Sequence, residues 1–133
     1  MNLKALLIIL LLTVTGLSAK TIKGKVISVW DGDTINVRSG AQTLKIRLDG
    51  IDCPELDQAY GRKARQYTSS LVLGTTVKVI LRQKDQYKRW LGEVLTPGGI
   101  SVNQALLQNG LAWQYLHNKE AKLTRLQNKA RAA

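Results

Sequence analysis

The segment from Thr43 to Glu55, TLKIRLDGIDCPE, constrains the fold of this chain most strongly. Its first six residues alternate between polar and apolar side chains, which is the pattern of a β-strand with one buried face. An Asp-Gly pair then predicts a turn. Arg47 is therefore expected on the polar face near a strand end, with Asp52 and Glu55 in the following loop. Such a group is either a surface ion pair or a site where carboxylates hold a hard cation beside a phosphate bound by arginine.

The remaining sequence predicts more short strands than helices. Besides the strand at 43–48, strands are expected at 20–29, 34–38, 75–82 and 90–95, and residues 111–116 are expected to be extended. Apolar residues at helical spacing predict a helix over 58–73, capped by Asp57, a short helix capped by Ser101, and a final helix that begins at Asn118. These elements predict an α+β fold that is mainly β, a five-stranded OB-fold barrel with about three helices. The order of the strands cannot be read from the sequence.

Residues 1–19 have the layout of a secretory signal peptide. Lys4 gives a positive start, an apolar run follows, and small residues end the segment at Ala19. The apolar run is shorter than the roughly 20 residues that a membrane-spanning helix needs. We expect cleavage after Ala19, a single domain over 20–133, a secreted or periplasmic location, and no stable membrane association after cleavage. An uncleaved membrane anchor is the alternative interpretation.

The charge of the domain predicts a polyanionic partner. Without Lys4 the chain has 19 basic and 9 acidic residues, a net charge of +10. Nucleic acid is the first candidate, ahead of anionic lipid or polysaccharide. Cys53 is the sole cysteine, so an intramolecular disulfide is impossible. With the only histidine, His117, far away in the sequence, we interpret Cys53 as a small filler of the core and not as a nucleophile.

Three motifs carry a resemblance to a known family. They are DGDT at Asp31–Thr34, RLDGIDCPE at Arg47–Glu55 and DQYKRWLGEV at Asp85–Val94. In this order and spacing they resemble the thermonuclease family, the staphylococcal nuclease-like secreted enzymes. The resemblance extends from about Lys23 to the final helix.

The resemblance implies roles for individual residues. Arg47 and Arg89 match the arginines that hold the scissile phosphate, and Glu55 matches the glutamate that activates or orients water. The positions that match the calcium site are Asp33, Asp52 and, through its backbone carbonyl, Cys53. Tyr87 matches a tyrosine near the bound phosphate. These roles agree with the needs of phosphodiester hydrolysis, which requires a positioned water, a cation and fixed positive charge.

Two further points concern residues around these motifs. Among the aromatic residues, Tyr115 is our candidate for stacking on a base, whereas Trp30 and Trp90 are expected to pack in the core. Lys88 stands where relatives usually have glycine, so a positive φ at this position would strain the turn before Arg89.

The leading hypothesis is a secreted, monomeric, Ca²⁺-dependent endonuclease. By resemblance it would cleave DNA and RNA with little sequence or sugar specificity, prefer single strands, and leave 3′-phosphate ends. The alternative is a non-catalytic OB-fold module that binds single strands. Binding alone gains nothing from acidic groups near phosphate, which favours the enzyme. A protein that binds polysaccharide or lipid would leave the carboxylates unexplained.

Overall fold

A computed structural model describes residues 19–133, so the predicted signal peptide lies outside the described residues except for Ala19. The described part contains seven strands and three helices. In chain order they are β1 (Lys20–Asp31), β2 (Thr34–Ser39), β3 (Gln42–Leu48), β4 (Ile51–Asp52), α2 (Gly61–Val72), β5 (Thr76–Lys84), β6 (Trp90–Leu95), α3 (Val102–Gln108), β7 (Trp113–Gln114) and α4 (Ala121–Ala132).

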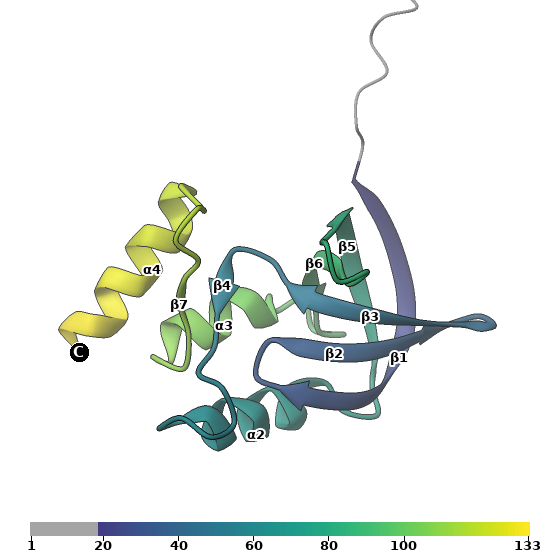
Figure 1. The fold of residues 1–133 in the computed structure, drawn as a ribbon, viewed down its shortest axis with the longest axis horizontal. Coiled ribbons are helices and arrows are strands. Elements are labelled where there is room, and N and C mark those ends of the chain that lie inside the picture. The colour runs from purple at the N-terminus through teal and green to yellow at the C-terminus, as the bar shows by residue number, and fades with distance from the viewer. Residues whose placement is uncertain (1–18) are drawn as a thin grey trace, which may run out of the picture.

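Five of the strands form a closed barrel in the order β1-β2-β3-β6-β5 (Figure 1). The barrel closes through the antiparallel pairing of β1 with β5. Among the strands of residues 19–133, β3 and β6 are the one parallel pair in the barrel. The alternation read from the sequence is confirmed, because its apolar positions are buried inside the barrel; they include Val26, Ile35, Val37, Ile46, Leu48, Val77, Val79 and Val94. The predicted mainly-β fold, a five-stranded barrel with three helices, is therefore confirmed.

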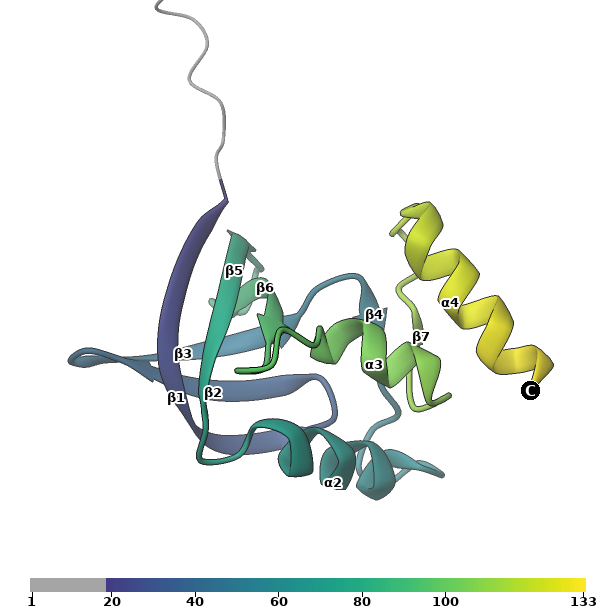
Figure 2. The ribbon, with the colours of Figure 1, turned by 180° about the vertical axis from the view of Figure 1, so that it is seen from behind.

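The helices cover one end of the barrel. Helix α2 lies below β1, and α3 lies between the barrel and α4 (Figures 1 and 2). Helix α4 docks by burying Leu123, while Leu126 packs against the core. Within residues 19–133, none of the helices is long and apolar enough to cross a membrane.

Strands β4 and β7 form a separate two-stranded sheet that the sequence did not predict. They are antiparallel, with Ile51 opposite Gln114 and Asp52 opposite Trp113. Of residues 111–116, expected to be extended, only Trp113 and Gln114 form a strand. This pairing brings the segment after α3 beside β4, the strand that carries Asp52.

The predicted start of the helix at 58–73 is wrong. Helix α2 begins at Gly61 and its N-cap is Tyr60, with a positive φ of 66° and no side-chain cap, so Asp57 does not cap it. The preceding residues form tight turns instead, because the backbone N–H of Gly61 donates to the carbonyl of Gln58 and that of Gln58 to the carbonyl of Glu55. A Cβ on Gly61 would overlap the carbonyl of Glu55, which explains the glycine.

Two other expectations need correction. The final helix begins at Ala121, because the Asn118 side chain accepts a hydrogen bond from the backbone N–H of Glu120 and forms a turn before it. Trp30 is not a core residue. It is 58% exposed, with the ammonium of Lys45 4.9 Å from its ring centre. Trp90 is partly buried against the core, as predicted, and Ser101 caps α3.

Candidate active site

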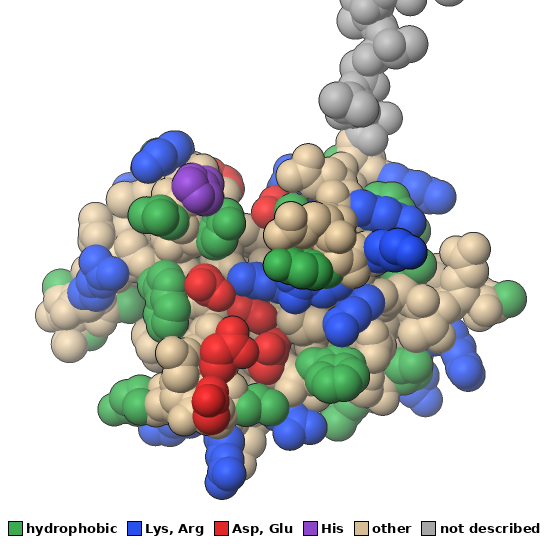
Figure 3. Space-filling view, in the orientation of Figure 1, with side chains coloured by type: hydrophobic (Ala, Val, Ile, Leu, Met, Phe, Trp, Pro, Cys, Tyr) green, Lys and Arg blue, Asp and Glu red, His purple; other side chains and the backbone are tan. Residues whose placement is uncertain are grey.

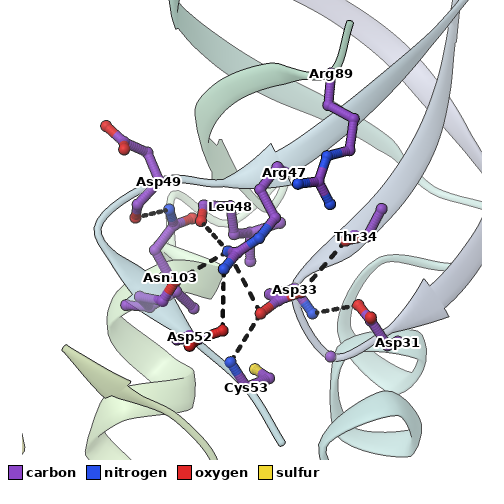
Figure 4. A network of polar contacts seen from close by, with 12 residues as sticks. Asp31, Asp33, Thr34, Arg47, Leu48, Asp49, Asp52, Cys53, Arg89 and Asn103 are labelled. Atoms are coloured by element: carbon purple, nitrogen blue, oxygen red, sulfur yellow. Dashed lines mark hydrogen bonds and ion pairs between the residues drawn. The ribbon is translucent and has the colours of Figure 1, made fainter. Parts of the chain in front are cut away.

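Arg47 is the centre of a polar network at the end of β3 that leads to β4. Its position on β3 directs the side chain past the strand end, between Asp33 and Asp52 (Figure 4). The guanidinium lies 3.3 Å from a carboxylate oxygen of Asp33 and 3.1 Å from one of Asp52. It also donates to the backbone carbonyls of Leu48, at 2.7 Å, and Ile51, at 2.9 Å. Arg47 therefore fixes the geometry of the loop between β3 and β4.

Asp33 is a buried carboxylate in the turn between β1 and β2. It accepts a hydrogen bond of 2.7 Å from the backbone N–H of Cys53, which ties this turn to the loop after β4. Burial raises the pKa of Asp33 from 3.8 to about 7, although the Arg47 cation opposes the rise and Asp31 adds to it. A carboxylate whose charge is disfavoured by burial is stabilised by any further cation that it binds.

Cys53 is buried, as expected for a filler. A Cβ on Gly32 would lie 2.8 Å from the Cys53 sulfur, so the two residues pack tightly. Burial raises the pKa of the Cys53 thiol, and the nearby Asp33 carboxylate reinforces the effect. The thiol thus remains protonated, which argues against a nucleophile.

Glu55 lies in the loop after β4, and its side chain is exposed to solvent. The Gln58 side chain accepts a hydrogen bond of 2.7 Å from the backbone N–H of Glu55. The loop is therefore held at its backbone while the carboxylate remains free to meet a ligand. No side-chain hydrogen bond occupies this carboxylate in the described part of the chain.

Arg89 comes from the hairpin between β5 and β6 and extends toward Arg47 (Figure 4). One carboxylate, that of Asp85, organises the hairpin: it accepts from the backbone N–H groups of Tyr87 and Arg89 and pairs with the Arg89 guanidinium at 2.8 Å. Desolvation acts to raise the pKa of Asp85, but these hydrogen bonds outweigh it and hold the pKa below its ordinary value. Lys88 has a φ of 62°, so the expected strain at this position is confirmed.

A pocket of about 200 Å³ joins the residues predicted to hold the substrate. It is lined by both arginines, Arg47 and Arg89, and by both predicted substrate-binding tyrosines, Tyr87 and Tyr115. The tyrosines are 68% and 45% exposed, so their rings are open to a ligand. The structure therefore brings together four residues from distant parts of the sequence. Arg47 and Tyr115 are 68 positions apart in it.

The charges around this pocket are sharply divided. Figure 3 shows acidic side chains gathered in the middle of one face, with Lys and Arg side chains directly beside them. Asp33 and Asp52 share the Arg47 guanidinium, which places them close together. Among residues 19–133, no three His, Cys, Asp or Glu side chains form a cluster ready to hold a metal. Two carboxylates plus a backbone carbonyl still match the all-oxygen ligands of calcium, with water completing the shell.

Comparison with known proteins identifies the family. A family model described as "Staphylococcal nuclease homologue" matches residues 45–133. The chain belongs to the staphylococcal nuclease family. An uncharacterized endonuclease of Escherichia coli O157:H7 is 46% identical over 111 residues, which cover 83% of this chain and 72% of that protein. A micrococcal nuclease of Shigella flexneri is 40% identical over 101 residues, which cover 70% of this chain and 58% of that protein. The chain is accordingly a hydrolase of the nuclease type.

Sequence reasoning missed several residues that shape this staphylococcal nuclease-like site. Asp31 accepts a hydrogen bond from the backbone N–H of Asp33, and buried Asn103 donates to the carbonyls of Asp49 and Gly92. Gln58 and Asp85 position Glu55 and Arg89 as described above. Asp31 and Asp85 belong to the motifs that carried the resemblance, so their motif positions could have flagged them. Nothing in the sequence marks Asn103 or Gln58.

Proposed function

We propose that the chain is a calcium-dependent nuclease that hydrolyses phosphodiester bonds of DNA and RNA with little sequence or sugar specificity. The observation that carries the proposal is the pocket where Arg47 and Arg89 meet beside Asp33 and Asp52. Two guanidinium groups from separate elements suit the oxygens of one phosphate, because each presents paired donors. The neighbouring carboxylates would repel phosphate unless a cation lay between them and the substrate.

Calcium fits the donors that this site offers. Asp33, Asp52 and the carbonyl of Cys53 would hold the ion, and burial of Asp33 leaves a carboxylate that gains from a second cation. When bound, calcium supplies polarisation of a phosphoryl oxygen and charge compensation. The remaining chemistry belongs to the side chains of the chain itself.

Each side chain has a distinct role in the proposed reaction. Arg47 and Arg89 orient the phosphate and compensate the negative charge that grows on it during attack. Glu55, exposed on its held loop, accepts a proton from the attacking water or orients it. Tyr87 and Tyr115 contact the nucleotide next to the scissile bond.

The lining of the pocket supports weak sequence preference. Stacking on tyrosine accepts any base, and contacts to phosphate carry no sequence information. An open pocket with stacking residues favours a flexible single strand, because its bases are not paired in a double helix and are free to stack on the tyrosine rings. The 3′-phosphate product and a monomeric state follow from the resemblance alone and are part of the same proposal.

One experiment tests the activity. The purified chain from Lys20 onward should degrade single-stranded DNA with calcium and stop when a chelator is added. Glu55→Gln should keep the fold and lower single-turnover cleavage by roughly 10²–10⁴-fold. Asp57→Asn, two residues along the same exposed loop, is the matched control and should cleave normally. Tight binding of DNA without cleavage under all of these conditions would instead support the non-catalytic module.

We also propose export across a membrane, on the basis of residues 1–19. Expression of the full chain in a bacterial host should yield a processed protein that starts at Lys20 in the periplasm or medium. Mass spectrometry of the recovered protein checks the cleavage point. An unprocessed chain that fractionates with membranes would favour the anchor.

A further inference from the structure

A second hollow adjoins the pocket of the two arginines. It has a volume of about 830 Å³ and lies between β7, the turn after it and α4. Asp52 lines it on one side, and Tyr115 lines both this hollow and the arginine pocket. A strand bound in the first pocket can therefore pass over Tyr115 into the second without leaving the surface.

Trp113 supplies an aromatic face to this hollow. In the β4–β7 pair it stands directly opposite Asp52, and side chains of directly opposed residues are close neighbours. Trp113 is 43% exposed, so a large part of its side chain is open to solvent. Its ring is therefore available beside a carboxylate that we propose as a calcium ligand.

The wall formed by α4 and the turn before it carries basic residues and is firmly attached to β7. Lys119 and Arg131 line the hollow, and among residues 19–133 Asp52 is the one acidic residue that lines it. Gln114, next to Trp113, fixes α4 to β7: its backbone N–H donates to Gln127 at 2.6 Å, and its side-chain carbonyl accepts from Thr124 at 2.7 Å. The hollow is thus a preformed groove with positive charge on one wall.

We propose that this groove is a second nucleotide subsite, in which a base stacks on Trp113, an adjacent phosphate contacts Arg131, and a further phosphate of the strand contacts Lys119 at the other end of α4. The proposal rests on the proposed function, because it extends the bound strand beyond the scissile phosphate. Stacking of a base on an aromatic ring tolerates any sequence, and basic side chains compensate the phosphate charge. The enzyme then recognises several nucleotides on one side of the cleaved bond, which favours internal cleavage of a strand over removal of terminal nucleotides.

The first test varies the length of the substrate. Short oligodeoxynucleotides with one phosphodiester among hydrolysis-resistant phosphorothioate linkages are extended on the 5′ side, on the 3′ side, or on neither. Trp113→Ala should raise KM about 5- to 150-fold for extension on one side only and leave the unextended substrate unchanged. Trp113→Phe should restore most of the affinity, since phenylalanine also stacks.

Trp30→Ala is the matched control. Trp30 is also an exposed tryptophan, but it lies on β1 and does not line the groove. It should leave KM unchanged for every substrate. Equal losses in Trp30→Ala and Trp113→Ala, or an equal loss on extended and unextended substrates, would overturn the proposed subsite.

The second test concerns the basic wall. Arg131→Ala should lower the slope of log affinity against log salt for a single strand by about 0.7, which corresponds to one phosphate contact. Arg125→Ala, an exposed arginine on the same helix that does not line the groove, should leave the slope unchanged. The same reduction in both variants would show diffuse attraction by a basic helix and would contradict a specific contact.

A third measurement separates this proposal from the proposed catalysis. With chelator present, binding of a single strand should quench the fluorescence of the wild-type protein, and the part of this quenching that Trp113 contributes should be absent in Trp113→Ala. Quenching through Trp113 without any calcium-dependent cleavage would uphold the subsite and reject the nuclease activity. Cleavage with unquenched Trp113 would uphold the activity and reject the subsite.

Discussion

The two arginines that meet in the pocket are held in opposite ways. Arg47 lies on a barrel strand, only 13% of its side chain is exposed, and it contacts two carboxylates and two backbone carbonyls. Arg89 lies on a hairpin between two strands, and one carboxylate, that of Asp85, holds both its backbone and its guanidinium. The first arginine is part of the structure of the barrel end, whereas the second depends on a local turn.

This difference teaches that one site can combine a fixed group with an adjustable one. Removing Arg47 leaves several buried acceptors without a partner, which damages the fold as well as the chemistry. Removing the contacts of Arg89 releases a solvent-exposed turn and leaves the barrel intact. Stability and turnover should therefore respond together at Arg47 and separately at Arg89.

The largest expected effect comes from replacing each arginine by lysine. Arg47→Lys and Arg89→Lys should each lower turnover by roughly 10²–10³-fold, because an ammonium cannot reproduce the paired donors of a guanidinium. Arg47→Lys should also lower the free energy of unfolding by roughly 2–4 kcal/mol. Arg89→Lys should change it by about 1 kcal/mol or less. Single-turnover cleavage and denaturant unfolding measure the two effects.

Arg38→Lys is the control for this comparison. Arg38 is exposed on β2 and is outside the pocket, so both quantities should stay at their wild-type values. Near-normal turnover in Arg47→Lys or Arg89→Lys would show that the arginine concerned is a surface charge. Equal loss of stability in both would show that the hairpin is as integral to the fold as the barrel end.

Replacing Asp33 by asparagine tests the fixed region without calcium. The folded-state pKa of Asp33, about 7, is above its ordinary value of 3.8, so the ionised form opposes folding and stability is lost as pH rises between these values. In the presence of chelator, Asp33→Asn should therefore be more stable than wild type by roughly 1–4 kcal/mol near pH 8. The advantage should disappear near pH 4. Thermal unfolding at several pH values measures it.

Calcium should reverse the order of these two proteins. A ligand that binds the folded state raises its stability, so calcium should raise the Tm of wild type at pH 8 and leave Asp33→Asn nearly unchanged. Asp57→Asn, with an exposed carboxylate, should respond to calcium as wild type does. An equal rise in Tm for wild type and Asp33→Asn would remove Asp33 from the set of calcium ligands.

The adjustable region is tested by Asp85→Asn. The side-chain oxygen of asparagine can still accept both backbone hydrogen bonds, from Tyr87 and Arg89, but the charge that pairs with the Arg89 guanidinium is lost. Turnover should fall by roughly 5- to 50-fold, less than for Arg89→Lys, because the guanidinium is still present but less well positioned. The free energy of unfolding should change by about 1 kcal/mol or less. A collapse in stability would show that the hairpin supports the barrel.

Much of the barrel could be predicted because its signals are local. The alternation up to Leu48, the turn at Asp31–Thr34 and the Ser101 cap each depend on a few neighbouring residues, and all are present in the structure. The polar position of Arg47 was predicted in the same way. Where two local signals compete, the prediction is wrong: Asp57 looks like a cap, but the turns made by Gln58 displace the helix start to Gly61.

The parts of the site that were not predicted depend on contacts between distant residues. The hydrogen bond from Cys53 to Asp33, the pairing of Trp113 with Asp52 and the burial of Asn103 join segments with no local pattern in common. The exposure of Trp30 also depends on how distant segments pack. The hydrophobicity of tryptophan predicts burial, but it does not show which face of its strand lies inside the barrel. The motifs supplied the candidate residues of the site, and long-range packing decides how these lie.

The smallest expected effect concerns the strain in the adjustable turn. Lys88 has a φ of 62°, a conformation that costs a residue with a side chain about 1–2 kcal/mol and costs glycine almost nothing. Lys88→Gly should therefore raise the free energy of unfolding by about 0.5–1 kcal/mol, after allowance for the greater freedom of glycine in the unfolded chain. Lys88→Ala removes the same charge but keeps the strain, so it should not be stabilised.

If the turn is held in one geometry by Asp85, turnover in Lys88→Gly stays within about twofold of wild type. A large rise in turnover would mean that strain at Lys88 displaces Arg89 from its best position, and the adjustable arginine would then be a point at which this enzyme limits its own rate.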